Sequence, residues 1–218
     1  MINGMIFDVD GVILDSMELW DNVPEWYLQK HHRKAEENLG RKMFEMTLYE
    51  GAFYLQEQYL PELEIDEILA GIKETVFEYY KNDVQMKPEM EDVLCWLHKQ
   101  NIPMVVATST AKESILAAFE RMHISMYFQR VLTCEEVGAG KNEPDIYVQA
   151  QQQMGTIPET TLVIEDSLFA IRTAKKAGFQ VLGVYDKESE SDQAEIQMLA
   201  DYYAKSFSVN LISQIMKE

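Results

Sequence analysis

The chain has 218 residues, 47% of them hydrophobic and 26% charged, which is typical of a globular protein with one domain and a smaller second one. With 37 acidic against 19 basic residues the formal net charge is −18, which argues against nucleic acid and anionic membranes as partners, since both attract basic surfaces. Cys95 and Cys134 make no disulfide framework, and neither a membrane span nor a signal-type N-terminus stands out, so we expect a soluble, cytoplasmic protein.

The first predicted element is a short buried strand at 4–8, whose apolar run leads into Asp8. Asp10 and Gly11 follow, and the glycine allows the backbone to turn sharply. Two carboxylates held close together repel each other, which raises a pKa unless a cation or hydrogen bonds intervene. Asp and Gly are also common turn residues, so this segment favours a functional site but leaves a structural turn open.

The next stretch, residues 16–82, reads as helices without convincing strands. One helix is expected to bend near Pro24, a second to run over about 42–59, and a third to carry an apolar stripe over 65–76. Four aromatic residues of this stretch are expected in a helical-bundle core rather than in ligand stacking: Trp20, Trp26, Phe53 and Tyr54.

From Lys87 the pattern changes to alternating helices and strands. The predicted strands lie at 103–107, 130–133, 161–164 and 181–184. Short β-branched runs alternating with amphipathic helices indicate a parallel sheet covered on both faces. The strand at 4–8 belongs with this part, so we expect an α/β core of residues 1–15 plus 83–218, interrupted by a helical insertion at 16–82.

Ligands of open α/β sheets bind outside the carboxyl ends of the strands, so the residues that follow each strand are candidates. Thr108 and Ser109 directly follow the strand at 103–107, and hydroxyls with backbone amides at a helix N-terminus can bind an anion. Ser and Thr also cap helices, and for these two residues alone the capping interpretation is favoured.

A glycine-flanked lysine, Lys141, precedes a predicted helix start. The segment is not a P-loop, because Glu135 stands where the first glycine should be and Asn142 replaces Ser or Thr. A lone surface lysine is usually solvated. An acid of the helix's first turn, Asp145, suits the helix dipole and is given no catalytic role.

Two further acids, Glu165 and Asp166, end the strand at 161–164. If they lie beside Asp8 and Asp10 at adjacent strand ends, the four residues make an oxygen-rich site for a hard cation. Mg²⁺ prefers octahedral oxygen ligands, takes few carboxylates and keeps several waters. The sequence therefore predicts a magnesium site at this edge of the sheet.

Together these segments resemble, in order, motifs I to IV of the haloacid dehalogenase-like (HAD) superfamily. The matching segments are Asp8 to Ser16, Thr108, Gly138 to Asp145, and Glu165 to Gly178. Asn142 replaces the first proline of motif III, and Ala170 replaces the first glycine of motif IV. The resemblance implies a Rossmann-like α/β core with an inserted α-helical cap domain at 16–82.

The resemblance also implies a Mg²⁺-dependent phosphoric monoester hydrolase that acts through an aspartyl-phosphate. In this family pattern Asp8 is the nucleophile and Asp10 the general acid and base. The implied metal ligands are Asp8, Asp10 through its backbone carbonyl, Asp166 and Glu165. The implied phosphate-binding residues are Thr108, Ser109 and Lys141.

Within the superfamily the chain looks most like the β-phosphoglucomutase-like group of sugar-phosphate phosphatases and mutases. The mutases carry a His five residues after the last acid of motif I, and this position, counted from Asp15, is Trp20. Tryptophan cannot relay a proton, so hydrolysis of a small phosphorylated metabolite is favoured over a β-phosphoglucomutase-type reaction. A non-catalytic binding member is a further alternative, although Asp8 and Asp10 are both present. The leaving group and the oligomeric state cannot be read from the sequence.

Overall fold

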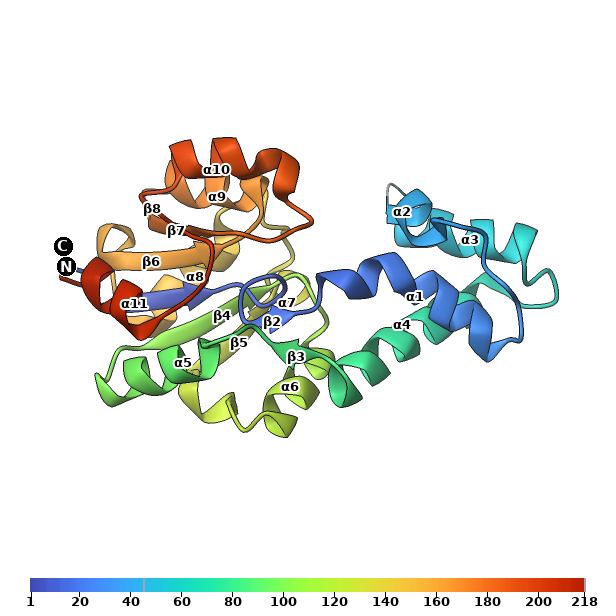
Figure 1. Cartoon of the computed structure of the whole chain (residues 1–218), viewed down its shortest axis with the longest axis horizontal. Helices are drawn as coiled ribbons and strands as arrows, with labels where there is room; N and C mark the ends of the chain where they lie inside the picture. The colour runs from blue at the N-terminus through green and yellow to red at the C-terminus, as the bar shows by residue number, and fades with distance from the viewer. Residues whose placement is uncertain (45, 218) are drawn as a thin grey trace. The chain divides into compact units, whose positions relative to one another are not determined.

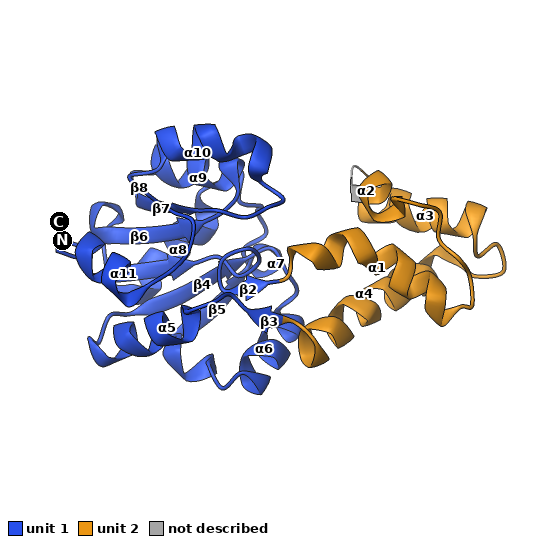
Figure 2. Ribbon diagram, in the orientation of Figure 1, with its two compact units in different colours: residues 1–15, 85–218 blue, residues 16–84 orange. Residues whose placement is uncertain are grey.

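The computed structural model describes residues 1–44 and 46–217 of the chain. Two compact units are formed, one of residues 1–15 with 85–218 and the other of residues 16–84 (Figure 2). The second unit is therefore an insertion into the first unit, between residues 15 and 85. The two connecting segments pair with each other as a short antiparallel ribbon, β2 (Leu14–Asp15) with β3 (Gln85–Met86).

The first unit contains a six-stranded sheet in the order β5-β4-β1-β6-β7-β8, with every neighbouring pair parallel (Figure 1). Its strands are β1 (Gly4–Phe7), β4 (Met104–Thr108), β5 (Arg130–Thr133), β6 (Thr161–Glu165), β7 (Gln180–Val184) and β8 (Tyr202–Ala204). The predicted α/β class with a parallel sheet is confirmed. The edge strand β8 was not predicted, because its short, half-buried sequence carries no apolar run.

Helices pack on both faces of the sheet. They are α5 (Met90–Lys99), α6 (Lys112–Arg121), α7 (Cys134–Val137), α8 (Asp145–Met154), α9 (Leu168–Lys176), α10 (Gln193–Leu199) and α11 (Val209–Ile215). Strand residues such as Ile6 and Val163 share one core cluster with residues of α8, α9 and α10. On the opposite face Phe7 contacts Phe128, whose ring stacks on Phe119 of α6. Full burial of each such side chain stabilises the fold by about 1.5–3 kcal/mol.

The strand order places β1 in the middle of the sheet, between β4 and β6. From β1 the chain builds β4 and β5 on one side, and it then returns to build β6, β7 and β8 on the other. In the register Phe7 pairs with Val106 of β4 and with Ile164 of β6. The residues just beyond these pairs, Asp8 and Glu165 among them, therefore lie at one end of the sheet, where this class of fold binds ligands.

Among its described residues, the regular secondary structure of the second unit is entirely helical, with turns and loops between the helices. Its helices are α1 (Met17–Lys30), α2 (Leu39–Phe44), α3 (Leu48–Gln58) and α4 (Ile65–Asn82). The helix α1 continues through Pro24. In the part of the chain that the structure describes, no helix is both long enough and apolar enough to span a membrane.

Two details of the helical prediction are wrong. The single helix expected over 42–59 is two helices, because Thr47 and Glu50 form a capping box that starts α3: Glu50 N donates to Thr47 Oγ1 at 3.3 Å and Thr47 N donates to Glu50 Oε2 at 2.8 Å. Phe53, expected in the helical core, is 49% exposed, since the buried face of α3 is formed by Gly51, Ala52 and Leu55.

Candidate active site

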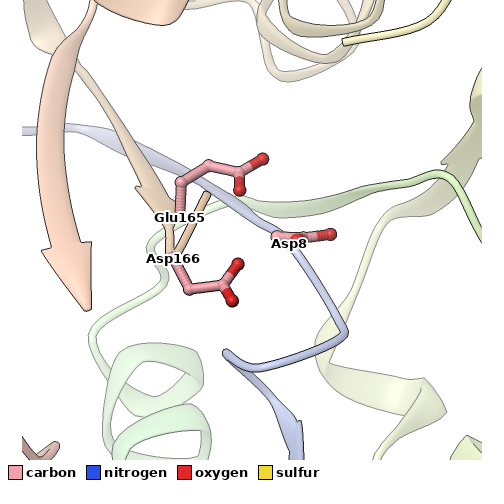
Figure 3. Close-up of side chains that lie close together, drawn as sticks. All are labelled: Asp8, Glu165 and Asp166. Atoms are coloured by element: carbon pink, nitrogen blue, oxygen red, sulfur yellow. The ribbon is translucent and has the colours of Figure 1, made fainter. Parts of the chain in front are cut away.

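Three acids meet at the carboxyl edge of the sheet. Asp8 follows β1, Glu165 ends the adjacent β6 and Asp166 comes next, and their side chains project to the same side (Figure 3). One carboxylate oxygen from each lies within 4.8 Å of the others, and all three residues are buried. The β1–β6 pairing continues up to the cluster, where Asp8 N donates to the carbonyl of Ile164 at 3.0 Å. The predicted proximity of Asp8 to the acids after β6 therefore follows from strand register.

Lys141 lies inside this cluster rather than on the surface. Its side chain is 4% exposed, and its Nζ lies 2.6 Å from Asp8 Oδ1 and 2.7 Å from Glu165 Oε1. The loop that carries it starts at Gly138, whose φ of +77° ends α7, and it is followed by α8 from Asp145. The interpretation of Lys141 as a solvated lysine is therefore wrong.

Burial dominates the electrostatics of the cluster. Burial, followed by repulsion from Glu165, raises the pKa of Asp8 well above its ordinary value, although Lys141 opposes the shift. Burial and Glu165 likewise raise the pKa of Asp166 to about 7. Burial disfavours the charged form of Lys141 as well, but the carboxylates of Asp8 and Glu165 outweigh it and hold the lysine pKa above its usual range. The lysine is therefore a cation, and its single positive charge does not neutralise the three acids.

The donors present fit a divalent cation. Three carboxylates and one ammonium group sum to a charge of −2 when all are ionised. Glu165 Oε2 is buried and lacks a hydrogen-bond partner within residues 1–44 and 46–217. One oxygen from each acid lies within 4.8 Å of the other two, so a single cation could contact all three. An all-oxygen donor set with an unpartnered carboxylate oxygen is the chemistry that Mg²⁺ prefers.

Asp10 and Thr108 are linked through Thr110. The hydroxyl of Thr110 donates to Asp10 Oδ2 at 2.7 Å, and its backbone N–H donates to Thr108 Oγ1 at 3.1 Å. Thr108 is fully buried as the last residue of β4. The N-cap residue of α6 is Ala111, so the capping interpretation of Thr108 and Ser109 is wrong.

Ser109 points elsewhere. It is exposed, and its Oγ lies 3.4 Å from Cys134 Sγ, at the start of α7. The structure therefore brings Asp8, Glu165, Asp166 and Lys141 together but gives Ser109 a different neighbour.

Gly11 is required where it stands. Its φ is +75°, and a Cβ at this position would lie 2.4 Å from Asp166 Oδ2. The turn after Asp10 therefore passes directly against Asp166, the residue that follows β6, which explains why a glycine follows the second aspartate.

The sequence patterns assign no separate role to four residues of this edge: Thr110, Tyr147, Lys87 and Asp186. Tyr147 OH donates to Glu165 Oε1 at 2.8 Å, yet its place in the apolar stripe of α8 indicates only a core residue. Lys87 Nζ lies 2.6 Å from the buried Asp186 Oδ2 and 3.1 Å from Asp15 Oδ1. Asp186 comes just after β7, so inspection of every strand end would have found it.

The chain is similar to proteins of one family over most of its length. A family described as "Haloacid dehalogenase-like hydrolase" matches residues 5–184. The chain is 27% identical over 183 residues to "Phosphorylated carbohydrates phosphatase" of Thermotoga maritima, with 82% of this chain and 83% of that protein covered. It is 26% identical over 185 residues to fructose-1-phosphate phosphatase YqaB of Escherichia coli, with 83% of this chain and 95% of that protein covered.

Solved structures share its fold. A candidate β-phosphoglucomutase from Thermotoga maritima matches with a TM-score of 0.87 at 23% identity, with 98% of this chain and 100% of that chain covered. CbbY from Rhodobacter sphaeroides, crystallised in complex with phosphate, matches with a TM-score of 0.77 at 22% identity, with 97% of this chain and 96% of that chain covered. At these identities the likeness concerns the fold alone.

Proposed function

This chain belongs to the haloacid dehalogenase-like hydrolase family, and on that basis we propose that it is a Mg²⁺-dependent phosphatase of a small, sugar-phosphate-like monoester. The observation that carries the proposal is the buried ion pair of Lys141 with Asp8 and Glu165, beside Asp166. Relatives named as phosphatases of phosphorylated carbohydrates and of fructose 1-phosphate support the substrate class.

Asp8 is the nucleophile of the proposed reaction. Its carboxylate oxygen forms a bond to phosphorus, the bond from phosphorus to the ester oxygen breaks, and Asp10 donates a proton to the leaving oxygen. A water molecule then attacks the phosphorus of the aspartyl-phosphate while Asp10 accepts a proton from that water. Inorganic phosphate leaves, and Asp8 returns to its carboxylate form. The hydrogen bond from Thr110 supports this role of Asp10, because it fixes one carboxylate oxygen.

The remaining residues bind charge. Mg²⁺ would be held by the carboxylates of Asp8 and Asp166 and by the backbone carbonyl of Asp10. The carboxylate of Glu165 would be a further ligand. When bound, Mg²⁺ offsets the repulsion between the acids and the phosphate. Lys141 and the hydroxyl of Thr108 stabilise negative charge on the phosphoryl oxygens. Ser109 would join them only by exchanging its contact with Cys134 for the phosphate.

Phosphate release from p-nitrophenyl phosphate and from a panel of sugar, nucleotide and glycolate phosphates tests this function. We expect Mg²⁺-dependent release that EDTA abolishes, and a loss of roughly 10⁴-fold or more in Asp8→Asn. Asp145→Asn is the matched control, since Asp145 is an exposed acid in the first turn of α8. Release that survives EDTA or Asp8→Asn contradicts the mechanism, and a protein inactive on the whole panel supports the non-catalytic alternative.

A mutase is distinguished by its product. Trp20 of α1 stands where the mutases have a proton-relaying His, so we expect water to be the acceptor. Incubation with β-glucose 1-phosphate and its bisphosphate activator is then expected to give inorganic phosphate. Formation of glucose 6-phosphate instead indicates a β-phosphoglucomutase-type reaction.

A further inference from the structure

We infer that Tyr147 is a positioning residue for the metal site: its hydroxyl and Lys141 together hold one oxygen of Glu165, which leaves the other oxygen to bind the metal. The inference rests on the proposed function for the identity of the metal as Mg²⁺. It concerns a residue that the proposed mechanism does not use.

Both donors converge on the same atom. Tyr147 OH lies 2.8 Å from Glu165 Oε1, and Lys141 Nζ lies 2.7 Å from that same oxygen. The second oxygen, Oε2, is buried without a hydrogen-bond partner among the residues that the structure describes. Two donors on Oε1 restrict rotation of the carboxylate. A buried carboxylate oxygen with no donor is unfavourable unless a ligand completes it, so Oε2 is the atom that a cation would use.

The tyrosine is itself fixed in place. Tyr147 is fully buried in α8, and its ring lies 6.2 Å from that of Phe179, centroid to centroid, within the core cluster. Its hydroxyl therefore reaches Glu165 from the rigid core. A metal-binding carboxylate held by an outer hydrogen bond loses less freedom when the metal binds, and loss of such partners typically weakens metal affinity.

The type of residue also fits the charge of the site. The three acids and Lys141 sum to −2, which matches one divalent cation. A lysine or arginine at position 147 would add a positive charge, make the site less negative and compete with the metal for the carboxylates. A tyrosine hydroxyl adds a donor without adding charge, so it positions Glu165 and leaves the affinity for a cation intact.

Mg²⁺ binding to the metal-free full-length protein, measured by titration calorimetry without substrate, tests this role. Tyr147→Phe keeps the ring and removes the hydroxyl, and we expect its Kd for Mg²⁺ to rise roughly 10- to 100-fold. The KM for Mg²⁺ in phosphate release should rise by a similar factor, while kcat at saturating Mg²⁺ stays within about twofold. A Kd within about twofold of that of the unmodified protein overturns the inference.

Tyr203→Phe is the matched control. It removes a tyrosine hydroxyl from the same unit, where Tyr203 OH donates to Gln193 Oε1 at 2.7 Å, and it should leave the Kd for Mg²⁺ unchanged. Thermal melts of both variants separate a loss of folding from a loss of metal affinity.

A double-mutant cycle tests whether Tyr147 acts through Glu165. Glu165→Ala should weaken Mg²⁺ binding, and adding Tyr147→Phe to that variant should change the Kd by less than about twofold. If Tyr147→Phe weakens binding equally in both backgrounds, the tyrosine acts by another route and the inference fails.

The calorimetry also separates this inference from the proposed function. If Mg²⁺ binds, depends on Asp166 and weakens in Tyr147→Phe, but no phosphate ester is hydrolysed, the function fails and the inference stands. If the enzyme is active and its Kd for Mg²⁺ is the same in Tyr147→Phe as in the unmodified protein, the inference alone fails.

Discussion

Asp8 and Glu165 share a single ammonium group, that of Lys141. Asp166 has no such close partner in the cluster, and burial with nearby Glu165 raises its pKa to about 7. Breaking a buried pair leaves an uncompensated charge, so the cluster tolerates the loss of an acid better than the loss of the lysine. These residues favour either a proton or a cation at the site near neutral pH.

The raised pKa of Asp166 predicts a pH-dependent stability of the metal-free protein. The folded form binds this proton more tightly than the unfolded chain, in which the pKa is near its ordinary value of 3.8, so the stabilisation is complete below pH 3.8 and is lost as the pH rises through about 7. In EDTA we expect the Tm to fall between about pH 5 and pH 8 and Mg²⁺ to reverse the fall at pH 8.

Asp166→Asn is expected to flatten this pH dependence, because an amide does not titrate. Asp145→Asn, which changes an exposed acid, should leave it as it is. An equally steep fall in Asp166→Asn contradicts the assignment.

The hydroxyl of Thr110 is predicted to be needed for full activity. Because its hydroxyl donates to Asp10 Oδ2, Thr110→Val removes the bond while keeping the shape of the side chain. A hydrogen bond to a charged group contributes about 1.5–3 kcal/mol, so kcat for p-nitrophenyl phosphate should fall by roughly 10- to 100-fold. Thr110→Ser retains the hydroxyl and should retain most of the activity. An unchanged kcat in Thr110→Val shows that Asp10 does not depend on this bond.

At the scale of elements, local signals decided where helices begin. The apolar periodicity over 42–59 predicts one helix, but the capping box of Thr47 and Glu50 starts a new one at Leu48. A capping side chain accepts hydrogen bonds from backbone N–H groups of the first helical turn, and the spacing of apolar residues carries no information about these bonds. The sequence Thr-Leu-Tyr-Glu at 47–50 contains this capping signal, which predicts a helix start that periodicity alone does not.

Loss of this cap should destabilise the helical unit measurably. Thr47→Ala is expected to lower its free energy of unfolding by about 1 kcal/mol, whereas Thr47→Ser should keep the cap. Urea unfolding followed by tryptophan fluorescence measures this, since Trp20 and Trp26 lie in that unit. Equal stability of the alanine and serine variants would contradict a contribution from the cap.

The positions of the strands can be read from the sequence, but which residues lie side by side on neighbouring strands depends on their register. The runs at 103–107 and 161–164 are recognisable as strands from their apolar residues alone. That Asp8 lies beside the end of β6 depends instead on Phe7 pairing with Ile164. A register shift of one residue would turn the carboxylates to the opposite faces of the sheet.

At the scale of the whole molecule, a net charge of −18 coexists with a site proposed to bind phosphate. Charges farther apart than about 8 Å are largely screened at physiological salt, so Lys141 and a bound cation govern the site more than the total charge does. The role of the helical insertion, predicted at 16–82, as a cap and a location in the cytoplasm stay predictions.

The sequence by itself determined the α/β class, the helical insertion and the identity of Asp8, Lys141, Glu165 and Asp166 as site candidates. These follow from local periodicity and from residues placed directly after strands, which a linear pattern records. Only the tertiary structure decided that Lys141 is buried between two acids, that Thr110 holds Asp10 and that Tyr147 holds Glu165. Tyr147 and Glu165 are 18 residues apart and Thr110 and Asp10 are 100, so these contacts depend on strand register and helix packing.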